Sequence, residues 1–256
     1  MNIAIVTGAS SGLGGEFVRR IDGSGELDEI WVIARRRERL EALRRQVRTP
    51  LRVLALDLTE RASFDTLSGL LARERPRVRL LINAAGFGKI GSWKDISLRD
   101  CSDMIDLNCR AAVMMTQLAL PYMAKGARVV EISSTSAFQP FPFLNVYSAS
   151  KAFLYRYSRA LRAELRGTGI SVTVVCPYWI KDTEFIAKAQ KTENSGYIRS
   201  FPFASREDRV ALRALKASAR GRAVCTPGFL CTGHRVLSKV LPSAWLMGFW
   251  ALLRRI

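Results

Sequence analysis

A tyrosine and a lysine four residues apart, Tyr147 and Lys151, are the side chains of this sequence best suited to moving a proton. Residues at positions i and i+4 lie on the same face of an α-helix, so we expect the two to be neighbours. A nearby ammonium favours the phenolate and lowers a phenol pKa that normally lies near roughly 10. The pair therefore predicts acid/base chemistry, in which Tyr147 donates a proton to a carbonyl oxygen or accepts one from an alcohol.

A glycine-rich turn, Thr7 to Gly14, directly follows the first strand-like run of the chain. Glycines let the backbone come close to a pyrophosphate, and the amides that open the following helix supply partial positive charge. An ordinary tight turn is the alternative, but the position between a first strand and a first helix favours a dinucleotide phosphate site. The residues expected to form it are Gly8, Ser10, Ser11, Gly12, Leu13 and Gly14.

Two arginines, Arg35 and Arg36, follow the second strand-like run, and no acidic residue stands there before Glu38. In a dinucleotide fold an acidic residue at this strand end binds the ribose 2′-hydroxyl, whereas arginine accommodates a 2′-phosphate. The sequence therefore predicts NADP(H), with Arg35 and Arg36 at its 2′-phosphate. A basic first helical turn that faces solvent is the alternative.

The elements that must position these residues alternate between short β-branched runs and longer segments with 3.6-residue apolar periodicity. This alternation predicts a Rossmann-like α/β fold, a doubly wound parallel sheet with helices on both faces. The expected strands are Asn2 to Thr7, Glu29 to Ile33, Leu51 to Leu56, Val78 to Asn83, Ala127 to Ser133 and Ile170 to Cys176. The expected helices include Leu13 to Ile21, Arg37 to Val47 and Phe64 to Arg73.

The alternation breaks after Cys176, although the composition shows no linker. We expect a single domain over residues 1–256, in which residues 1–176 form the dinucleotide-binding and catalytic core. Residues 177–256 are expected to add a substrate loop and a C-terminal helical region. Within them the pattern predicts a helix over Ser205 to Ala219 and a last strand over Ala223 to Thr226.

Composition narrows the function further, because the chain carries a formal net charge of +18, five cysteines and one histidine. Its arginines are scattered and no nucleic-acid motif is present, so we expect no nucleic-acid partner. His234 alone argues against a His-based zinc site or a Ser/His/Asp triad, and we expect no metal. An odd number of cysteines without a C-x-x-C pair fits a reducing cytoplasm.

Neither end of the chain is predicted to cross a membrane. The first residues form a strand-like run without the features of a signal peptide. Val240 to Leu253 is apolar, but it contains Pro242 and Gly248 and is shorter than the roughly 20 residues of a spanning helix. The segment Trp245 to Arg255 has three possible roles: a pocket lid, a subunit interface, or a helix in peripheral membrane contact. We favour burial of the segment as a lid or an interface.

Several motifs stand in a fixed order along the chain. Ser134 follows the fifth expected strand, thirteen residues before Tyr147, and Asp57, Asn83-Ala84-Ala85-Gly86 and Asn108 lie upstream. Over roughly residues 1 to 176 the sequence resembles the short-chain dehydrogenase/reductase family. The resemblance implies an oxidoreductase that moves a hydride between the nicotinamide of NADP(H) and a carbonyl or alcohol, and a homodimer or homotetramer.

The resemblance also implies a role for each matching residue. Ser134 would polarise the substrate oxygen, Tyr147 would be the acid/base, and Lys151 would bind the nicotinamide ribose and lower the tyrosine pKa. Asn108 would hold a water in the proton relay to Lys151. The other cofactor residues would be Asp57 and Leu58 beside the adenine, Asn83, Ala84, Ala85 and Gly86 beside the adenosine ribose, and Thr183 at the carboxamide.

Two segments depart from the family pattern. Ala84 replaces the second asparagine of Asn-Asn-Ala-Gly, which removes one structural hydrogen bond but leaves the cofactor site. Pro177 to Thr183 lacks the glycine of Pro-Gly-x-x-x-Thr and is one residue longer, so the register of Thr183 on the carboxamide is left open.

Aromatic residues near the expected nicotinamide position indicate an apolar pocket, with core packing as the alternative for each. They are Phe138, Phe141, Phe143, Tyr178, Trp179, Phe185 and Tyr197. We expect a bulky hydrophobic ketone or secondary alcohol, of hydroxysteroid or bile-acid type or of long-chain 3-oxoacyl type. The alternatives are a membrane-surface lipid ketoreductase and a non-catalytic NADP(H)-binding redox sensor, against which the complete catalytic set argues.

Overall fold

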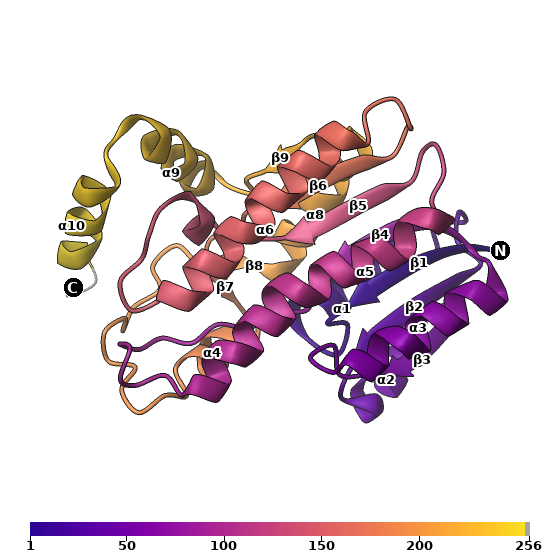
Figure 1. Cartoon of the computed structure of the whole chain (residues 1–256), viewed down its shortest axis with the longest axis horizontal. Coiled ribbons are helices and arrows are strands. Elements are labelled where there is room, and N and C mark those ends of the chain that lie inside the picture. Colours follow the sequence, from indigo (N-terminus) through magenta and orange to yellow (C-terminus); the bar gives the residue numbers. More distant parts are fainter. Residues whose placement is uncertain (254–256) are drawn as a thin grey trace.

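The computed structural model describes residues 1–253. Its centre is a seven-stranded parallel sheet (Figure 1). The strands lie in the order β3-β2-β1-β4-β5-β6-β9, and every pair of neighbours is parallel. Their bounds are β1 (Asn2–Thr7), β2 (Glu29–Ala34), β3 (Leu51–Ala55), β4 (Arg77–Asn83), β5 (Arg128–Ile132), β6 (Ser171–Val175) and β9 (Val224–Cys225). The predicted fold is confirmed.

Helices cover both faces of this sheet because successive strand residues point to opposite sides. Ala4 and Val6 of β1 face α1 (Gly12–Ile21), α2 (Arg37–Arg44) and α8 (Glu207–Ala219). Ile3 and Ile5 face α3 (Arg61–Glu74), α5 (Ala111–Ala119) and α6 (Asn145–Glu164), which lie in front of the sheet in Figure 1. Both faces of β1 are therefore apolar, as buried parallel strands require.

One long helical segment changes its hydrogen-bonding pattern in its middle. It consists of α4 (Leu98–Ile105), a π-helical turn η1 (Asp106–Arg110) and α5, and it is followed by the short 3₁₀ turn η2 (Leu120–Tyr122). A π-helical turn inserts an extra residue into an α-helix and is frequent at functional sites. Here the inserted turn contains Asn108, one of the predicted catalytic residues.

The strand order reverses between β1 and β4, where β2 and β3 extend to one side and β5, β6 and β9 to the other. In open α/β sheets ligands bind beyond the carboxyl ends of the strands at such a point. The turns that follow β1, β4, β5 and β6 meet there, and they begin at Gly8, Ala84, Ser133 and Cys176. The fold thus brings the predicted glycine turn and the predicted catalytic serine to one edge.

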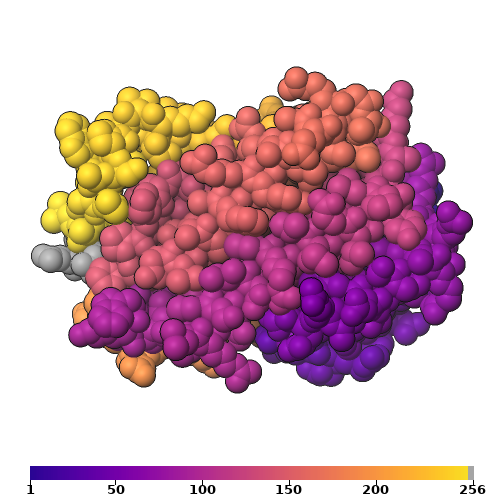
Figure 2. Space-filling view, in the orientation of Figure 1, coloured from indigo at the N-terminus to yellow at the C-terminus, as the bar shows by residue number. Residues whose placement is uncertain are grey.

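The chain beyond Cys176 adds small elements over this edge. A two-stranded sheet of β7 (Ile180–Lys181) and β8 (Ser205–Arg206) precedes α8, and α7 (Phe185–Ala189) lies between the two strands. After β9 follow α9 (Phe229–Val240) and α10 (Ser243–Leu253). Figure 2 shows this last segment, in yellow, at one end of the molecule.

Helix α10 has two different faces. Leu246 is buried, and the Trp250 ring lies against Phe141 with centroids 5.0 Å apart, whereas Trp245 and Phe249 are exposed. Within residues 1–253 no helix combines the length and the apolar character needed to cross a membrane. The predicted basic end of the segment, Arg254 and Arg255, lies outside the described residues.

Candidate active site

A cavity of about 460 Å³ opens at the carboxyl edge of the sheet, where the strand order reverses. Its size is typical of a small-molecule site. Residues from the turns after β1, β2, β3, β4, β5 and β6 line it, together with the start of α6 and the loop that carries α7. The predicted site residues among them are Gly8, Ser10, Ser11, Gly12, Leu13, Gly14, Arg35, Arg36, Asp57, Leu58, Ala84, Ala85, Gly86, Ser134, Tyr147, Lys151 and Thr183.

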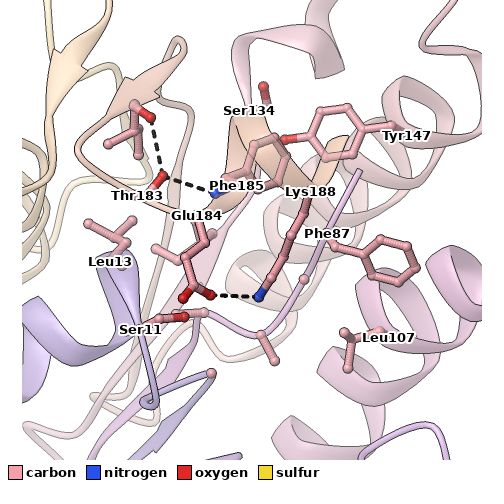
Figure 3. Close-up of a pocket in the computed structure, with 18 of the residues that line it drawn as sticks. Ser11, Leu13, Phe87, Leu107, Ser134, Tyr147, Thr183, Glu184, Phe185 and Lys188 are labelled. Carbon is pink, nitrogen blue, oxygen red and sulfur yellow. Dashed lines mark hydrogen bonds and ion pairs between the residues drawn. The ribbon is translucent and has the colours of Figure 1, made fainter. Parts of the chain in front are cut away.

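Ser134, Tyr147 and Lys151 all line the cavity, and Figure 3 shows Ser134 and Tyr147 side by side. Ser134 lies beside Tyr147 in Figure 3, and its hydroxyl accepts a bond from the Ser136 amide at 3.1 Å and donates to the Pro177 carbonyl at 3.5 Å. Lys151 Nζ lies 5.7 Å from the Tyr147 ring centroid and donates to the Ile132 carbonyl at 2.9 Å. Helix α6 thus places the tyrosine and the lysine on one face, with the serine opposite.

The charges of this group are set mainly by burial. Burial raises the pKa of Tyr147 to about 12, against the effect of the Ser134 hydrogen bond. Burial also lowers the pKa of Lys151 to about 8. The lowered phenol pKa expected from the sequence is therefore not found in the chain alone, because desolvation of the phenolate is the largest effect on Tyr147.

Asn108 is held close to this group by its own hydrogen bonds. Its Oδ1 accepts from the Phe87 amide at 3.0 Å, and its Nδ2 donates to the Phe87 carbonyl at 2.9 Å and to Ser150 Oγ at 3.0 Å. A Cβ on Gly86 would lie 2.8 Å from Asn108 Oδ1 and 3.2 Å from Lys151 Nζ. Only glycine at position 86 lets the asparagine and the lysine come this near each other.

The glycine turn has the shape that a pyrophosphate needs. Gly8 has φ 69°, and a Cβ there would lie 2.8 Å from the backbone of Ala85. Thr7 Oγ1 accepts bonds from the Ala84 and Ala85 amides at 3.1 and 3.0 Å, which ties the turns after β1 and β4 together. The cradle that only glycine permits supports the fit of a dinucleotide at this edge.

The two predicted phosphate-binding arginines have different partners. Arg35 is mostly exposed and lies 3.6 Å from Asp57 Oδ2, and this contact helps to lower the pKa of Asp57. Arg36 reaches the glycine turn, where its Nη2 donates to Ser10 Oγ at 3.2 Å and Ser11 Oγ at 2.8 Å. The guanidinium of Arg36 therefore lies beside the glycine turn.

Asn83, expected beside the adenosine ribose, has its side chain inside the protein. It is buried and does not line the cavity; its Nδ2 donates to Ala112 O at 3.3 Å, Thr116 Oγ1 at 2.9 Å and Glu131 Oε1 at 2.8 Å. As the last residue of β4, Asn83 directs its side chain to the α5 face, away from the cofactor edge. Ala84 to Gly86 line the cavity and Asn83 does not, so of this run only the last three residues face the cavity.

Thr183 lies over the glycine turn. Its methyl group would be 3.3 Å from a Cβ on Gly12, and its hydroxyl donates to Ile180 O at 3.2 Å and accepts from the Phe185 amide at 3.3 Å. Figure 3 shows Thr183 between Leu13 and Phe185. The hydroxyl is therefore engaged within its own loop.

The predicted aromatic residues divide into two groups. Phe141, Tyr178, Trp179 and Phe185 line the cavity. Phe143 stacks on Tyr197 with centroids 4.0 Å apart, and Phe138 packs on Tyr155 and His234. Phe138, Phe143 and Tyr197 do not line the cavity. For Phe138, Phe143 and Tyr197 the packing alternative therefore holds.

Several cavity residues were not predicted. Phe87 follows the glycine of the Asn-Ala-Ala-Gly run, and Trp250 comes from α10. Glu184 and Lys188 come from the α7 loop, and Lys89 and Lys191 are further basic residues at the cavity. Two sequence features pointed to residues of this set: Phe87 stands beside a recognised motif, and Trp250 lies in the segment for which a pocket lid was one expectation.

Among residues 1–253 no group of three or more His, Cys, Asp and Glu side chains could hold a metal ion. The five cysteines are free, and Cys176, Cys225 and Cys231 are buried.

The sequence matches the model of the short chain dehydrogenase family over residues 2–194. It is 36% identical over 186 residues to a sulfoacetaldehyde reductase of Chromohalobacter salexigens, covering 70% of this chain and 72% of that one. It is 34% identical over 187 residues to the NADP-dependent 3-hydroxy acid dehydrogenase of Escherichia coli, covering 72% and 74%.

Among solved structures it resembles a short-chain dehydrogenase from Sphingobium yanoikuyae in complex with NADPH. The TM-score is 0.78, the identity is 26%, and the match covers 95% of this chain and 98% of that one. The chain belongs to the short-chain dehydrogenase family, and the predictions of the family and of an oxidoreductase are confirmed.

Proposed function

We propose that this oxidoreductase interconverts a ketone and a secondary alcohol, with Ser134, Tyr147, Lys151 and Asn108 as its catalytic residues. The observation that carries the proposal is the meeting of Ser134, Tyr147 and Lys151 at one end of a cavity that also holds the glycine turn. A redox sensor without turnover would not need these side chains together.

NADP(H) is the cofactor, as the sequence predicted. Relatives in the family are NADP-dependent or bind NADPH, and the cavity of this chain presents Arg35 and Arg36 at the end of β2. We propose that the glycine turn, Asp57, Leu58 and the run Ala84 to Gly86 hold the dinucleotide. When bound, NADPH supplies the hydride.

The residues of the chain position the substrate and supply the proton. Ser134, whose hydroxyl is held by the Ser136 amide, would donate to the substrate carbonyl and fix it beside Tyr147. A tyrosine with a pKa of about 12 is protonated at neutral pH and is suited to donating a proton during reduction. Lys151, with a pKa of about 8, would return the proton to Tyr147.

A bulky hydrophobic carbonyl compound is the proposed substrate class. Besides Tyr147, six aromatic side chains of the cavity support it: Phe87, Phe141, Tyr178, Trp179, Phe185 and Trp250. Burying apolar area against them contributes about 25 cal/mol per Å². Within one domain, residues 177–256 would serve to cover such a substrate.

A small anionic substrate is the second candidate. The relatives named above act on 3-hydroxy acids or sulfoacetaldehyde, and this cavity also contains Lys89, Lys188 and Lys191. Lys89 and Lys188 already pair with Asp100 and Glu184, at 3.4 and 2.7 Å, so these two are not free to bind a substrate anion. We therefore favour the apolar substrate.

A substrate panel tests the choice directly. Consumption of NADPH would be followed with ketosteroids, 3-oxoacyl thioesters, 3-oxo acids and sulfoacetaldehyde. We expect kcat/KM to rise with apolar surface among the ketones. Turnover of only the small anions would contradict the apolar substrate. If wild type binds NADPH but turns over no compound of the panel, the redox sensor would be supported.

A further inference from the structure

Glu184 places a carboxylate in the cofactor cavity among three cations. Arg36 Nη1 donates to Glu184 Oε2 at 2.9 Å, Lys188 Nζ donates to the same oxygen at 2.7 Å, and Arg39 Nη1 contacts Oε1. Figure 3 shows Glu184 pointing from its loop toward Ser11 of the glycine turn, with Lys188 beside it. The carboxylate therefore joins the α7 loop to the start of α2.

The same guanidinium is the one proposed for the 2′-phosphate. Arg36 contacts Ser10 and Ser11 on one side and Glu184 on the other. A phosphate monoester offers three acceptor oxygens and carries about −1.5 to −2 charge at neutral pH. Two anions at one guanidinium repel each other, so a bound phosphate and Glu184 compete.

We propose that Glu184 occupies the anion position that the 2′-phosphate of NADP(H) takes on binding, and so sets the discrimination between NADP(H) and NAD(H). The inference rests on the proposed cofactor site. Hydrogen bonds from Lys188, Arg39 and Arg36 lower the pKa of Glu184 to about 2, so its carboxylate is charged at every working pH. NADH has no phosphate to displace it.

The competition reaches the catalytic end of the cavity through the next residue. Glu184 directly precedes α7, whose first residue, Phe185, has its ring centroid 5.6 Å from that of Tyr147. Displacing Glu184 from Arg36 and Arg39 would free the residue next to Phe185, whose ring lies against Tyr147. The 2′-phosphate would thus act on a segment that borders the substrate.

Binding of four ligands by calorimetry tests the proposal without turnover. They are NADPH, NADH, adenosine 2′,5′-bisphosphate and adenosine 5′-monophosphate. Glu184→Gln should tighten NADPH and the bisphosphate about tenfold, as expected for one charge-assisted contact, and change the other two by less than about twofold. Glu193→Gln is the control, because it removes the same charge from an exposed position nine residues along the same segment.

Hydrogen exchange of the loop is the second readout. The Lys188 amide donates to the Glu184 carbonyl at 3.0 Å, and its exchange reports whether the loop is held. In the chain without ligand, Glu184→Gln should speed exchange over residues 184–190. The bisphosphate should do so in wild type, whereas the monophosphate should not.

Three results would overturn the inference. Weaker NADPH binding by Glu184→Gln would mean that Glu184 orients the arginines for the phosphate. Equal changes for NADPH and NADH and for the bisphosphate and the monophosphate would mean a general effect of charge. So would equal changes in Glu193→Gln. Failure of wild type to bind NADPH would contradict the cofactor site itself and the inference with it, a result distinct from the other two.

Discussion

The Tyr147 hydroxyl stands beside Ser134, while its ring packs near Phe185. Replacing Tyr147 with phenylalanine removes the hydroxyl and keeps the ring. We expect turnover to fall about 10²- to 10⁴-fold, because general acid catalysis is lost. NADPH binding, measured by calorimetry, should stay within about threefold of wild type, since no charged contact is removed.

Tyr155→Phe is the matched control for this change. Tyr155 lies on the same helix α6, and its ring packs against Phe138 outside the cavity. Its turnover should equal that of wild type. A Tyr147→Phe enzyme that keeps more than about a tenth of the wild-type rate would show that another group supplies the proton.

A buried carboxylic acid, Glu131 of β5, makes the stability of the protein depend on pH. Glu131 has no exposed surface, and its Oε2 has no hydrogen-bond partner in the part of the chain that the structure describes. Burial raises the pKa of Glu131 from 4.5 to about 7. The folded state therefore holds this proton more tightly than the unfolded state does.

A raised pKa fixes the sign of the effect. The contribution of Glu131 to the free energy of unfolding is complete below about pH 4.5 and is lost as the pH rises through about 7, by about 3 kcal/mol. Urea unfolding at pH 5 and pH 7.5 measures the difference. Glu131→Gln should flatten the dependence while Glu60→Gln, at an exposed position, should not; an unchanged slope in Glu131→Gln would assign the effect elsewhere.

Residues whose roles depend on local spacing could be predicted, and those with distant partners could not. Tyr147 and Lys151 share one turn of a helix, so their spacing alone indicates a pair. Glu184 is 148 positions from Arg36 and 145 from Arg39, and no local pattern marks such contacts. The direction of the Asn83 side chain could not be predicted either, because a residue at a strand end can point to either face of the sheet.

At the scale of elements, we expect α10 to limit how large a substrate the cavity accepts. Trp250 lines the cavity and packs on Phe141, whereas Trp245 of the same helix is 70% exposed. Trp250→Ala should raise KM for a bulky ketone about tenfold or more with little change in kcat, since it removes an apolar contact worth about 1.5 to 3 kcal/mol. Steady-state kinetics with NADPH saturating measures this.

Trp245→Ala offers the control on the same helix, because it removes the same side chain from the outer face. Its kinetics should match wild type. With a small ketone, wild type and Trp250→Ala should have equal KM values. Equal KM values with a bulky ketone would place the substrate elsewhere in the cavity.

Strands and helices of the sheet were predictable because burial imposes an apolar pattern on them. β1 was predicted with its observed bounds, and β2 differs by one residue. The expected helix from Phe64 begins three residues earlier, at Arg61, because its first turn is mostly polar. The π-helical turn at Asn108 could not be foreseen, since one inserted residue barely alters the periodicity.

At the scale of the whole molecule, the outer face of α10 exposes large apolar side chains. Trp245, Phe249 and Leu252 are all exposed on it. Such patches mark interaction sites, and we expect them to lie between subunits of a homodimer or homotetramer. Phe249→Asp should lower the assembly state, which sedimentation measures.

Phe203→Asp places the same charge at another exposed phenylalanine, far along the chain from α10, and should leave the assembly unchanged. A wild-type monomer would contradict the subunit interface. Binding of wild type, but not of Phe249→Asp, to anionic vesicles would instead assign the face to a membrane surface.

Two of the five tryptophans, Trp179 and Trp250, line the cavity, while Trp31 is buried in the sheet and Trp93 and Trp245 are exposed. Tryptophan emits in the wavelength range that reduced nicotinamide absorbs and oxidised nicotinamide does not. The protein thus carries its own optical probe: energy transfer from the cavity tryptophans would quench their emission when the reduced form enters. Occupancy and redox state of the site could then be followed by light alone, before any substrate is known.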